Sequence, residues 1–247
     1  MYEKKTEIDI VLEKYFSVCV DLKLIFVLKM LSNQIKYLII KELKLELRNK
    51  YALGGILLYV VSTVFISYLS FKKIVTPATW NALFWIILLF ASINAIAKSF
   101  ITETKGRLLY MYTLASPQAV ILSKIIYNSL LLIVLSALCL LAYSLFIGNI
   151  IQDLPLFLIT LFMGSLGFSS LLTMVSAIAS KAGNNFTLMA ILSFPIIIPL
   201  LMVLIKLSKN AIDGLERWDL DYLTILMLLN LIIIALSYLL FRYLWRD

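Results

Sequence analysis

The sequence contains no histidine, and its 247 residues include only two cysteines. Without histidine the chain has no imidazole for a proton shuttle, for a metal site or for the usual axial ligation of haem. Cys19 and Cys139 lie far apart, and Cys139 falls inside a long apolar run, so we expect a packed thiol there rather than a disulfide. From these absences we expect no metal site and no catalytic site in this chain.

Charged residues are also scarce. They make up 15% of the chain, whereas hydrophobic residues make up 62% and the mean hydropathy is +1.00. A soluble domain cannot bury that much apolar surface, but a lipid bilayer accommodates it. The net charge of +8 does not indicate nucleic acid as a partner, because the basic residues lie mostly at the ends of apolar runs, where they set membrane orientation.

Two functional patterns are missing as well. None of the eight glycines begins a G-x-x-x-x-G-K-[ST] phosphate-binding loop, so any ATP hydrolysis has to come from a partner. No acidic residue falls inside the long apolar runs, and a proton-driven carrier needs titratable groups at that depth. Both absences favour a passive permease that another protein drives.

Six apolar runs are each long enough, at about 20 residues, to cross the roughly 30 Å of hydrocarbon in a bilayer. Such runs must be helical, because unpaired backbone groups are too costly in lipid and the runs are too long for barrel strands. The sequence therefore predicts an all-α integral membrane protein whose domain, residues 51–247, has six transmembrane helices: Leu53–Phe71, Trp80–Lys98, Val120–Phe146, Leu154–Ser180, Phe186–Lys206 and Tyr222–Tyr243.

The residues before the first run divide into two parts. Residues 1–29 carry five acidic and five basic residues without a signal-peptide pattern, and we expect this extension to be dispensable. Residues 30–50 repeat apolar side chains at helical spacing, which predicts an amphipathic interfacial helix lying in the headgroup layer. A helix packed on a partner is the alternative. The apolar positions are Ile35, Leu38, Ile39, Leu43 and Leu47.

The distribution of lysine and arginine predicts the orientation in the membrane. If the amino terminus is cytoplasmic, the inner side holds twelve basic residues: Lys36, Lys41, Lys44, Arg48, Lys50, Lys98, Lys105, Arg107, Lys124, Lys181, Arg242 and Arg246. The outer side then holds five: Lys72, Lys73, Lys206, Lys209 and Arg217. This excess favours both termini in the cytoplasm. The side chains of Lys98 and Lys124 are expected to reach the inner surface.

A short polar stretch, ETKGRLLYMYTLASP, separates the second run from the third. Its glycine can break the direction of the chain, and its proline turns the chain into the third run. Between them, an apolar stripe about two turns long predicts a short amphipathic helix at the inner face, a shape that another protein could push on. An ordinary loop on the headgroups is the alternative. The residues of this candidate ATPase-coupling helix are Glu103, Gly106, Arg107, Leu108, Met111, Tyr112 and Pro117.

The fourth and fifth runs carry two further features. Small polar residues on one face of the fourth run predict a helix-packing seam, either sliding or static, with a substrate path as another alternative. Prolines in the fifth run each remove a backbone hydrogen bond, and we expect a mobile kink that faces protein or a cavity. The seam residues are Ser165, Ser169, Thr173 and Ser176, and the kink residues are Pro195 and Pro199.

Amides and indoles are the other polar groups of interest in the runs. The asparagines are predicted to join helices by hydrogen bonds, with a polar path as the alternative. The tryptophans are predicted to lie in the aromatic belts at the membrane surfaces. The residues concerned are Asn94, Asn128 and Asn230, and Trp80, Trp85, Trp218 and Trp245.

Several stretches resemble known families. The segment ETKGRLLYMYTLASPQAVILSK is similar to the coupling-helix region of ABC-2-type permeases, which docks into a groove on an ATPase. From about Met30 onward the chain resembles the CcmB family of haem exporter proteins in cytochrome c maturation. This resemblance lies in KELKLELRNKYALGG, GSLGFSSLLTMVSAIASKAGNN and LSFPIIIPLLM, in their order, in the six runs and in the length.

The resemblance implies a permease subunit in a bacterial inner membrane. Its expected partners are a separate ATPase (CcmA), a haem-handling membrane protein (CcmC), a small helper (CcmD) and a haem chaperone (CcmE). A second copy of the chain is a further candidate partner. Haem and ATP are expected to bind to the partners and not directly to this chain. Two alternative functions stay open: an ABC-2-type exporter of a lipid-linked glycan or drug, and a non-transporting membrane scaffold.

Overall fold

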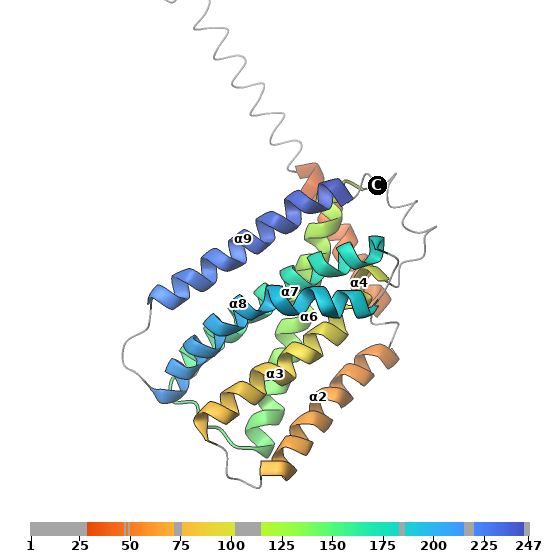
Figure 1. The fold of residues 1–247 in the computed structure, drawn as a ribbon. Helices are drawn as coiled ribbons and strands as arrows, with labels where there is room; N and C mark the ends of the chain where they lie inside the picture. Colours follow the sequence, from red (N-terminus) through yellow and green to blue (C-terminus); the bar gives the residue numbers. More distant parts are fainter. Residues whose placement is uncertain are drawn as a thin grey trace, which may run out of the picture.

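The computed structural model describes residues 29–46, 48, 50–71, 76–101, 115–182, 186–214 and 220–244, and all regular secondary structure in them is α-helical. Residues 29–46 form what we call the amino-terminal helix. The helices that follow are α2 (Lys50–Phe71), α3 (Pro77–Ile96), α4 (Lys98–Ile101), α6 (Pro117–Phe146), α7 (Leu154–Lys181), α8 (Phe186–Asp213) and α9 (Leu220–Leu244). Six of them, all but α4, are long and apolar enough to cross a membrane, which confirms the predicted spans (Figure 1).

Three of the spans begin at a side-chain cap. The hydroxyls of Thr76 and Ser116 and the carboxylate of Asp153 each accept a hydrogen bond from the backbone N–H three residues later, at 3.3, 3.3 and 3.1 Å. Such caps satisfy an N–H group that the first helical turn leaves without a partner. In each case a proline, whose fixed φ suits a helix start, lies in that first turn: Pro77, Pro117 and Pro155.

Helix α7 is the centre of the bundle. It packs against α3, α4, α6, α8 and α9, and Figure 1 shows it among them. In its membrane-spanning window 72% of the residues are buried, against 11% for α2. A helix surrounded by protein needs small side chains on several faces, and α7 has the serines and glycines to provide them.

Tryptophan lies in the core of this bundle, and the prediction that Trp80 and Trp85 form a surface belt is wrong. Both side chains are buried. The Trp80 indole N–H donates to the carbonyl of Gly148 at 3.2 Å, and that of Trp85 donates to the hydroxyl of Ser208 at 2.8 Å. Because the protein itself supplies these acceptors, the indoles do not need the membrane surface. The thiol of Cys139 is free and buried, as expected.

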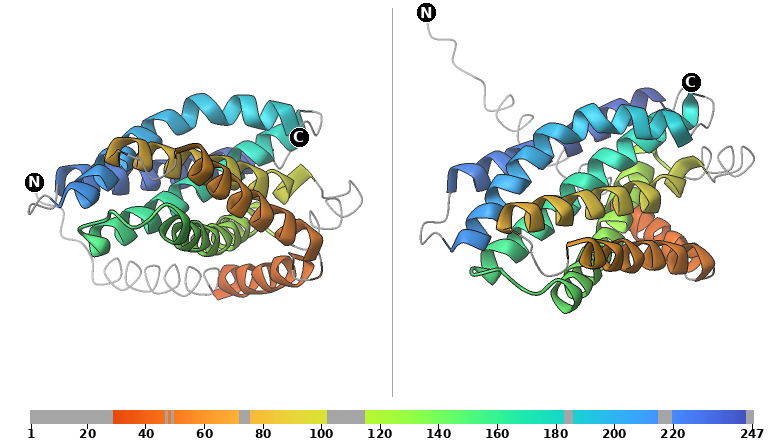
Figure 2. Two further views of the ribbon diagram at one scale, coloured as in Figure 1. Left: turned by 90° about the horizontal axis from the view of Figure 1, so that it is seen from below. Right: turned by 60° about the horizontal axis from the view of Figure 1, so that its bottom comes forward.

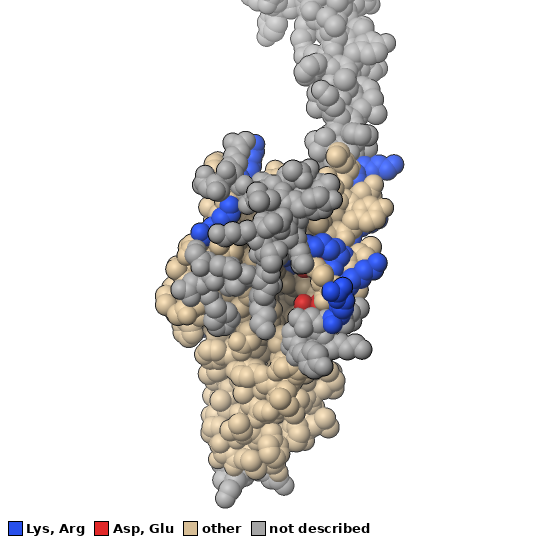
Figure 3. All heavy atoms as spheres, turned by 90° about the vertical axis from the view of Figure 1, so that its right-hand side faces the viewer, with Lys and Arg blue, Asp and Glu red and all other residues tan. Residues whose placement is uncertain are grey.

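The amino-terminal helix and the carboxyl end of α9 lie at the same end of the bundle (Figures 1 and 2). An even number of spans returns the chain to the side from which it started. In Figure 3, lysine and arginine side chains gather at this end, and the described residues below them on that face are uncharged.

Two glycines of α7 permit the closest helix contacts. A β-carbon at Gly164 would lie 2.9 Å from the ring of Trp85 on α3. One at Gly167 would lie 2.6 Å from Oδ1 of Asn230 on α9 and 2.8 Å from Cδ2 of Leu200 on α8. These positions therefore set how near α3, α8 and α9 come to the central helix.

Gly167→Val is expected to lower the free energy of unfolding by about 1–3 kcal/mol, because a β-carbon and two methyl groups enter a filled space. The control is Gly55→Val on α2, where a β-carbon would have nothing within 4 Å. The thermal unfolding midpoint in mild detergent should fall for the Gly167 variant and not for the Gly55 variant. Equal midpoints for the two variants would contradict this packing analysis.

Candidate functional site: the junction around Lys124

Most residues of the candidate coupling helix lie outside the described part of the chain. These are Glu103, Gly106, Arg107, Leu108, Met111 and Tyr112, whereas Pro117 is the first residue of α6. The chain is described again on both sides of this stretch. Helix α4 ends at Ile101 before it, and Ser116 caps α6 after it.

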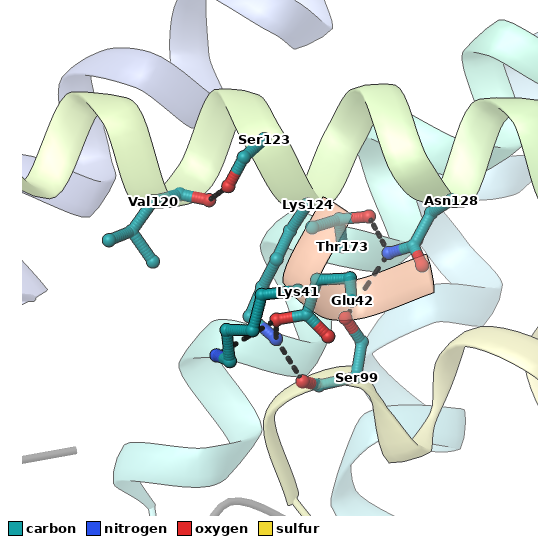
Figure 4. A network of polar contacts seen from close by, with 8 residues as sticks. All are labelled: Lys41, Glu42, Ser99, Val120, Ser123, Lys124, Asn128 and Thr173. Atoms are coloured by element: carbon teal, nitrogen blue, oxygen red, sulfur yellow. Dashed lines mark hydrogen bonds and ion pairs between the residues drawn. The ribbon is translucent and has the colours of Figure 1, made fainter. Parts of the chain in front are cut away.

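Lys124, two turns into α6, is buried with 1% of its surface exposed, and the prediction that it reaches the inner surface is wrong. Its ammonium donates to the carbonyl oxygen of Ser99 at 2.5 Å and lies 3.4 Å from Oε1 of Glu42 (Figure 4). It also lies 4.5 Å from the ring centre of Phe100. Ser99 belongs to the four-residue helix α4, whose carbonyls lack intrahelical partners. A cation is therefore well placed at this helix end.

Asn128, one turn after Lys124, adds a second link to the same serine. Its amide nitrogen donates to the hydroxyl of Ser99 at 3.2 Å and to that of Thr173 on α7 at 2.8 Å (Figure 4). Both α6 side chains thus bond to Ser99, and one of them continues to α7. Glu42, Ser99, Lys124, Asn128 and Thr173 are together called the Lys124 junction.

The amino-terminal helix contacts the start of α6 at two points. Oε1 of Gln34 accepts a hydrogen bond from the hydroxyl of Ser116 at 3.1 Å, and Glu42 pairs with Lys124. The two residues of each pair are the same number of positions apart in the sequence, so the two helices run side by side in the same direction. The helix therefore packs on its own chain through polar groups, while Tyr37 and other apolar side chains are exposed.

Apolar side chains surround the Lys124 junction. One hydrophobic cluster joins α4, α6, α7 and α9, with the amino-terminal helix at its margin, and it consists of Phe100, Val120, Ile121, Ile125, Ala177 and Phe241, with Leu38, Ala115 and Leu122 against them. The rings of Phe100 and Phe241 lie 5.6 Å apart. Five elements therefore meet at the two places where the described chain ends at Ile101 and resumes at Ala115.

The predicted seam residues of α7 are all buried and contact the same chain. Ser165 donates to Ser136 at 3.2 Å, and the hydroxyls of Ser169 and Ser129 lie 3.0 Å apart. Thr173 bonds to Asn128, and Ser176 donates to the carbonyl of Ala97 at 3.4 Å. The seam thus joins α7 to α6 and to the end of α3, which favours static packing among the alternatives.

Pro195 and Pro199 lie inside α8 and are exposed. The expectation that they face protein or a cavity is wrong for the single chain. The opposite side of the helix carries the buried residues Ile197, Leu200 and Leu204, which occupy the core at spacings of three and four. Because that stripe faces α7, the prolines lie on the outer side of the helix. Their mobility stays a prediction.

The asparagines behave differently from one another. Asn128 joins three helices, and the amide of Asn230 donates to the carbonyl of Met163 at 3.2 Å, so both link helices as predicted. Asn94 is exposed on α3. Oδ1 of Asn230 is buried without a hydrogen-bond partner in the described part of the chain, facing the backbone of Gly167.

A groove of about 290 Å³ lies between the amino-terminal helix, α2 and α6. Its lining is apolar except for Glu46 and Tyr127, and consists otherwise of Leu43, Ile56, Leu57, Leu130, Leu131, Val134, Leu135 and Leu138. Among the described residues, no three Cys, Asp or Glu side chains come together in a way that could hold a metal ion.

Comparison with known protein families decides the identity. The CcmB protein family matches residues 33–241, which is most of the chain. The chain belongs to the CcmB family. No curated protein matched it. Members of the CcmB family are permease components of haem export in cytochrome c maturation, transporter subunits rather than catalytic enzymes, and they belong to a haem-transport system that includes an ATPase.

Sequence reasoning missed the burial of Lys124 in this CcmB family member. The signal was present, because Lys124 and Asn128 are four residues apart and therefore share one face of α6 inside an apolar run. Two polar side chains on one face indicate a common set of buried partners. Nothing in the local pattern indicated Glu42, which lies 82 positions earlier in the chain.

Asn128→Ala is expected to lower the unfolding midpoint in detergent, with a loss of about 1 kcal/mol for two interhelical hydrogen bonds. Asn94→Ala is the matched control, since that amide is exposed. A double-mutant cycle with Thr173→Val isolates the Asn128–Thr173 bond. Strictly additive losses in that cycle would show that the bond contributes no stability.

Proposed function

We propose that this chain is the permease subunit through which a separate ATPase drives haem trafficking in a bacterial inner membrane. The observation that carries this proposal is the CcmB family match over residues 33–241. The partners we infer are a CcmA-like ATPase, a CcmC-like haem-handling protein, a CcmD-like helper and a CcmE-like haem chaperone. A second copy of the chain is a further partner in this proposal.

The described charges support an orientation with both termini in the cytoplasm. The end with the amino-terminal helix carries mostly basic side chains: Lys29, Lys36, Lys41, Lys44, Arg48, Lys181 and Arg242. The opposite end carries Lys206 and Lys209 together with Asp153, Asp213 and Asp221. Basic residues accumulate on the cytoplasmic side of membrane proteins, so the amino-terminal helix is placed there in the proposal.

The stretch Glu103–Pro117 receives the ATPase stroke in this proposal. Support comes from its two described ends, because Ser99 before it and Ser116 after it are both hydrogen-bonded to buried or half-buried side chains of other elements. A push that arrives at these two ends would therefore reach α4, α6 and the amino-terminal helix. Lys124 and Asn128 extend that connection towards α7.

Haem is ligated by the partners in this proposal. The chain has no histidine to coordinate the iron. The apolar groove has a carboxylate, Glu46, and no basic residue in its lining, so the two haem propionates would meet a like charge there. A haem that passes this subunit would thus do so without a histidine ligand from it.

The test is a gentle detergent pull-down of the chain from its native membrane, with partners identified by mass spectrometry and haem measured by absorbance. We expect an ATPase and a histidine-bearing haem protein. Glu103→Lys and Leu108→Pro should each reduce ATPase recovery by about tenfold, since loss of one charged contact or of the helix costs at least about 1.4 kcal/mol. Lys209→Glu, at the opposite end, is the control. Full ATPase recovery with both variants would refute the coupling role.

Substitution of the two prolines in α8 distinguishes a permease that moves from a passive scaffold. Replacing Pro195 and Pro199 together by alanine restores two backbone hydrogen bonds and straightens α8. In a permease that moves, cytochrome c maturation should fall several-fold while the ATPase still co-purifies. The control is Ile198→Ala, an exposed position on the same helix. Unchanged maturation with the double variant would favour the scaffold.

A further inference from the structure

Lys124 is the one buried charged side chain among the residues that the structure describes. A buried charge is costly unless it is both paired and hydrogen-bonded, and here the carbonyl of Ser99 and the carboxylate of Glu42 meet that need. An apolar side chain of similar volume would often be tolerated at such a place. Packing alone therefore does not explain a lysine at position 124.

The lysine fixes three elements relative to one another. Through Ser99 it holds α4, through its own backbone it belongs to α6, and through Glu42 it holds the amino-terminal helix. The contact between Gln34 and Ser116, two turns away, fixes the same helix pair a second time. Two polar contacts at equal spacing prevent the amino-terminal helix from rotating or sliding along α6.

The outer side of the amino-terminal helix has a different character. Lys36 and Lys44 are exposed, as are Tyr37 and Ile40. A basic and apolar surface of this kind suits the headgroup layer. The helix therefore has one side bonded to the bundle and another that suits the membrane surface.

We propose that Lys124 is a positioning residue that clamps the amino-terminal helix to both ends of the stretch between α4 and α6, so that this helix moves with them. The inference rests on the proposed function, in which that stretch receives the ATPase stroke. The amino-terminal helix is then a moving part of the permease. Its displacement is driven through the Glu42–Lys124 pair.

The experiment measures docking and transport separately. In the reconstituted complex with Cys19→Ser, Gln34→Cys and Ser116→Cys, the rate of disulfide formation reports how often the helix is docked. Glu42→Leu removes the ion pair and leaves the Lys124 ammonium with the carbonyl of Ser99, so a loss of stability is expected beside the loss of docking, and the disulfide arm separates the two. It should lower the ratio of docked to undocked helix by about tenfold, which corresponds to the loss of an ion pair worth about 1.4 kcal/mol. Lys44→Met, exposed on the same helix, is the control.

ATP-driven release of haem-loaded chaperone should fall by a similar factor in Glu42→Leu, while ATPase binding is unchanged. Complete oxidation to the 34–116 disulfide should restore release, because a covalent bond then replaces the clamp. A general defect of folding would not be restored in this way. Lys124→Met should give the same pattern, and the protein should still fold, because an apolar side chain of similar volume is often tolerated at such a place.

Three outcomes would overturn the proposal: an unchanged cross-linking rate in Glu42→Leu, a slowed rate with full release, or release that the disulfide does not restore. Failure of the unaltered chain to bind any ATPase would instead overturn the proposed function. The cross-linking rate would in that case still decide whether Lys124 clamps the helix.

Discussion

A polar group in the interior of a bilayer can bond only to other protein groups, and this constraint governs the arrangement around α7. Its hydroxyls donate to carbonyls of the preceding turn, as in Ser165 to Leu161 and Thr173 to Ser169, or across to α6, where Ser169 donates to the carbonyl of Ile125. A helix rich in serine can therefore be buried in the centre without unpaired donors. The same constraint holds Lys124 in place, since its ammonium has one acceptor on α4 and another on the amino-terminal helix.

Two kinds of small residue give α7 two kinds of contact. Serine and threonine face α6, where hydrogen bonds fix the relative position of the helices. Gly164 and Gly167 face α3, α8 and α9, where close approach gives dispersion contacts but few directional bonds. The first interface resists sliding, because each bond would have to break where no water can replace it. The second interface has fewer directional bonds to oppose a shift of one helix past another.

The sequence predicted what depends on length and local chemistry. The six spans and their proline starts follow from runs of about 20 apolar residues and from the conformational limits of proline. The prediction failed where lipid and the protein interior accept the same residue types. Trp80 and Pro195 are equally compatible with lipid and with protein, and only long-range packing placed the first inside and the second outside. Glu42 reaches Lys124 across 82 positions, a contact without a local signature.

These constraints also indicate which parts can move together. The Lys124 junction and the seam bind α4, α6 and α7 into one unit with the amino-terminal helix attached. Helix α8 contacts this unit through apolar side chains such as Leu200 and Leu204, and its prolines weaken its own backbone. In the proposed function, a force applied between α4 and α6 would displace this unit as a body. Deformation is then expected at the contact between α7 and α8, because the described hydrogen bonds of α8 to another helix run to α3, from Asn81 to the carbonyl of Ile205 and from Trp85 to Ser208.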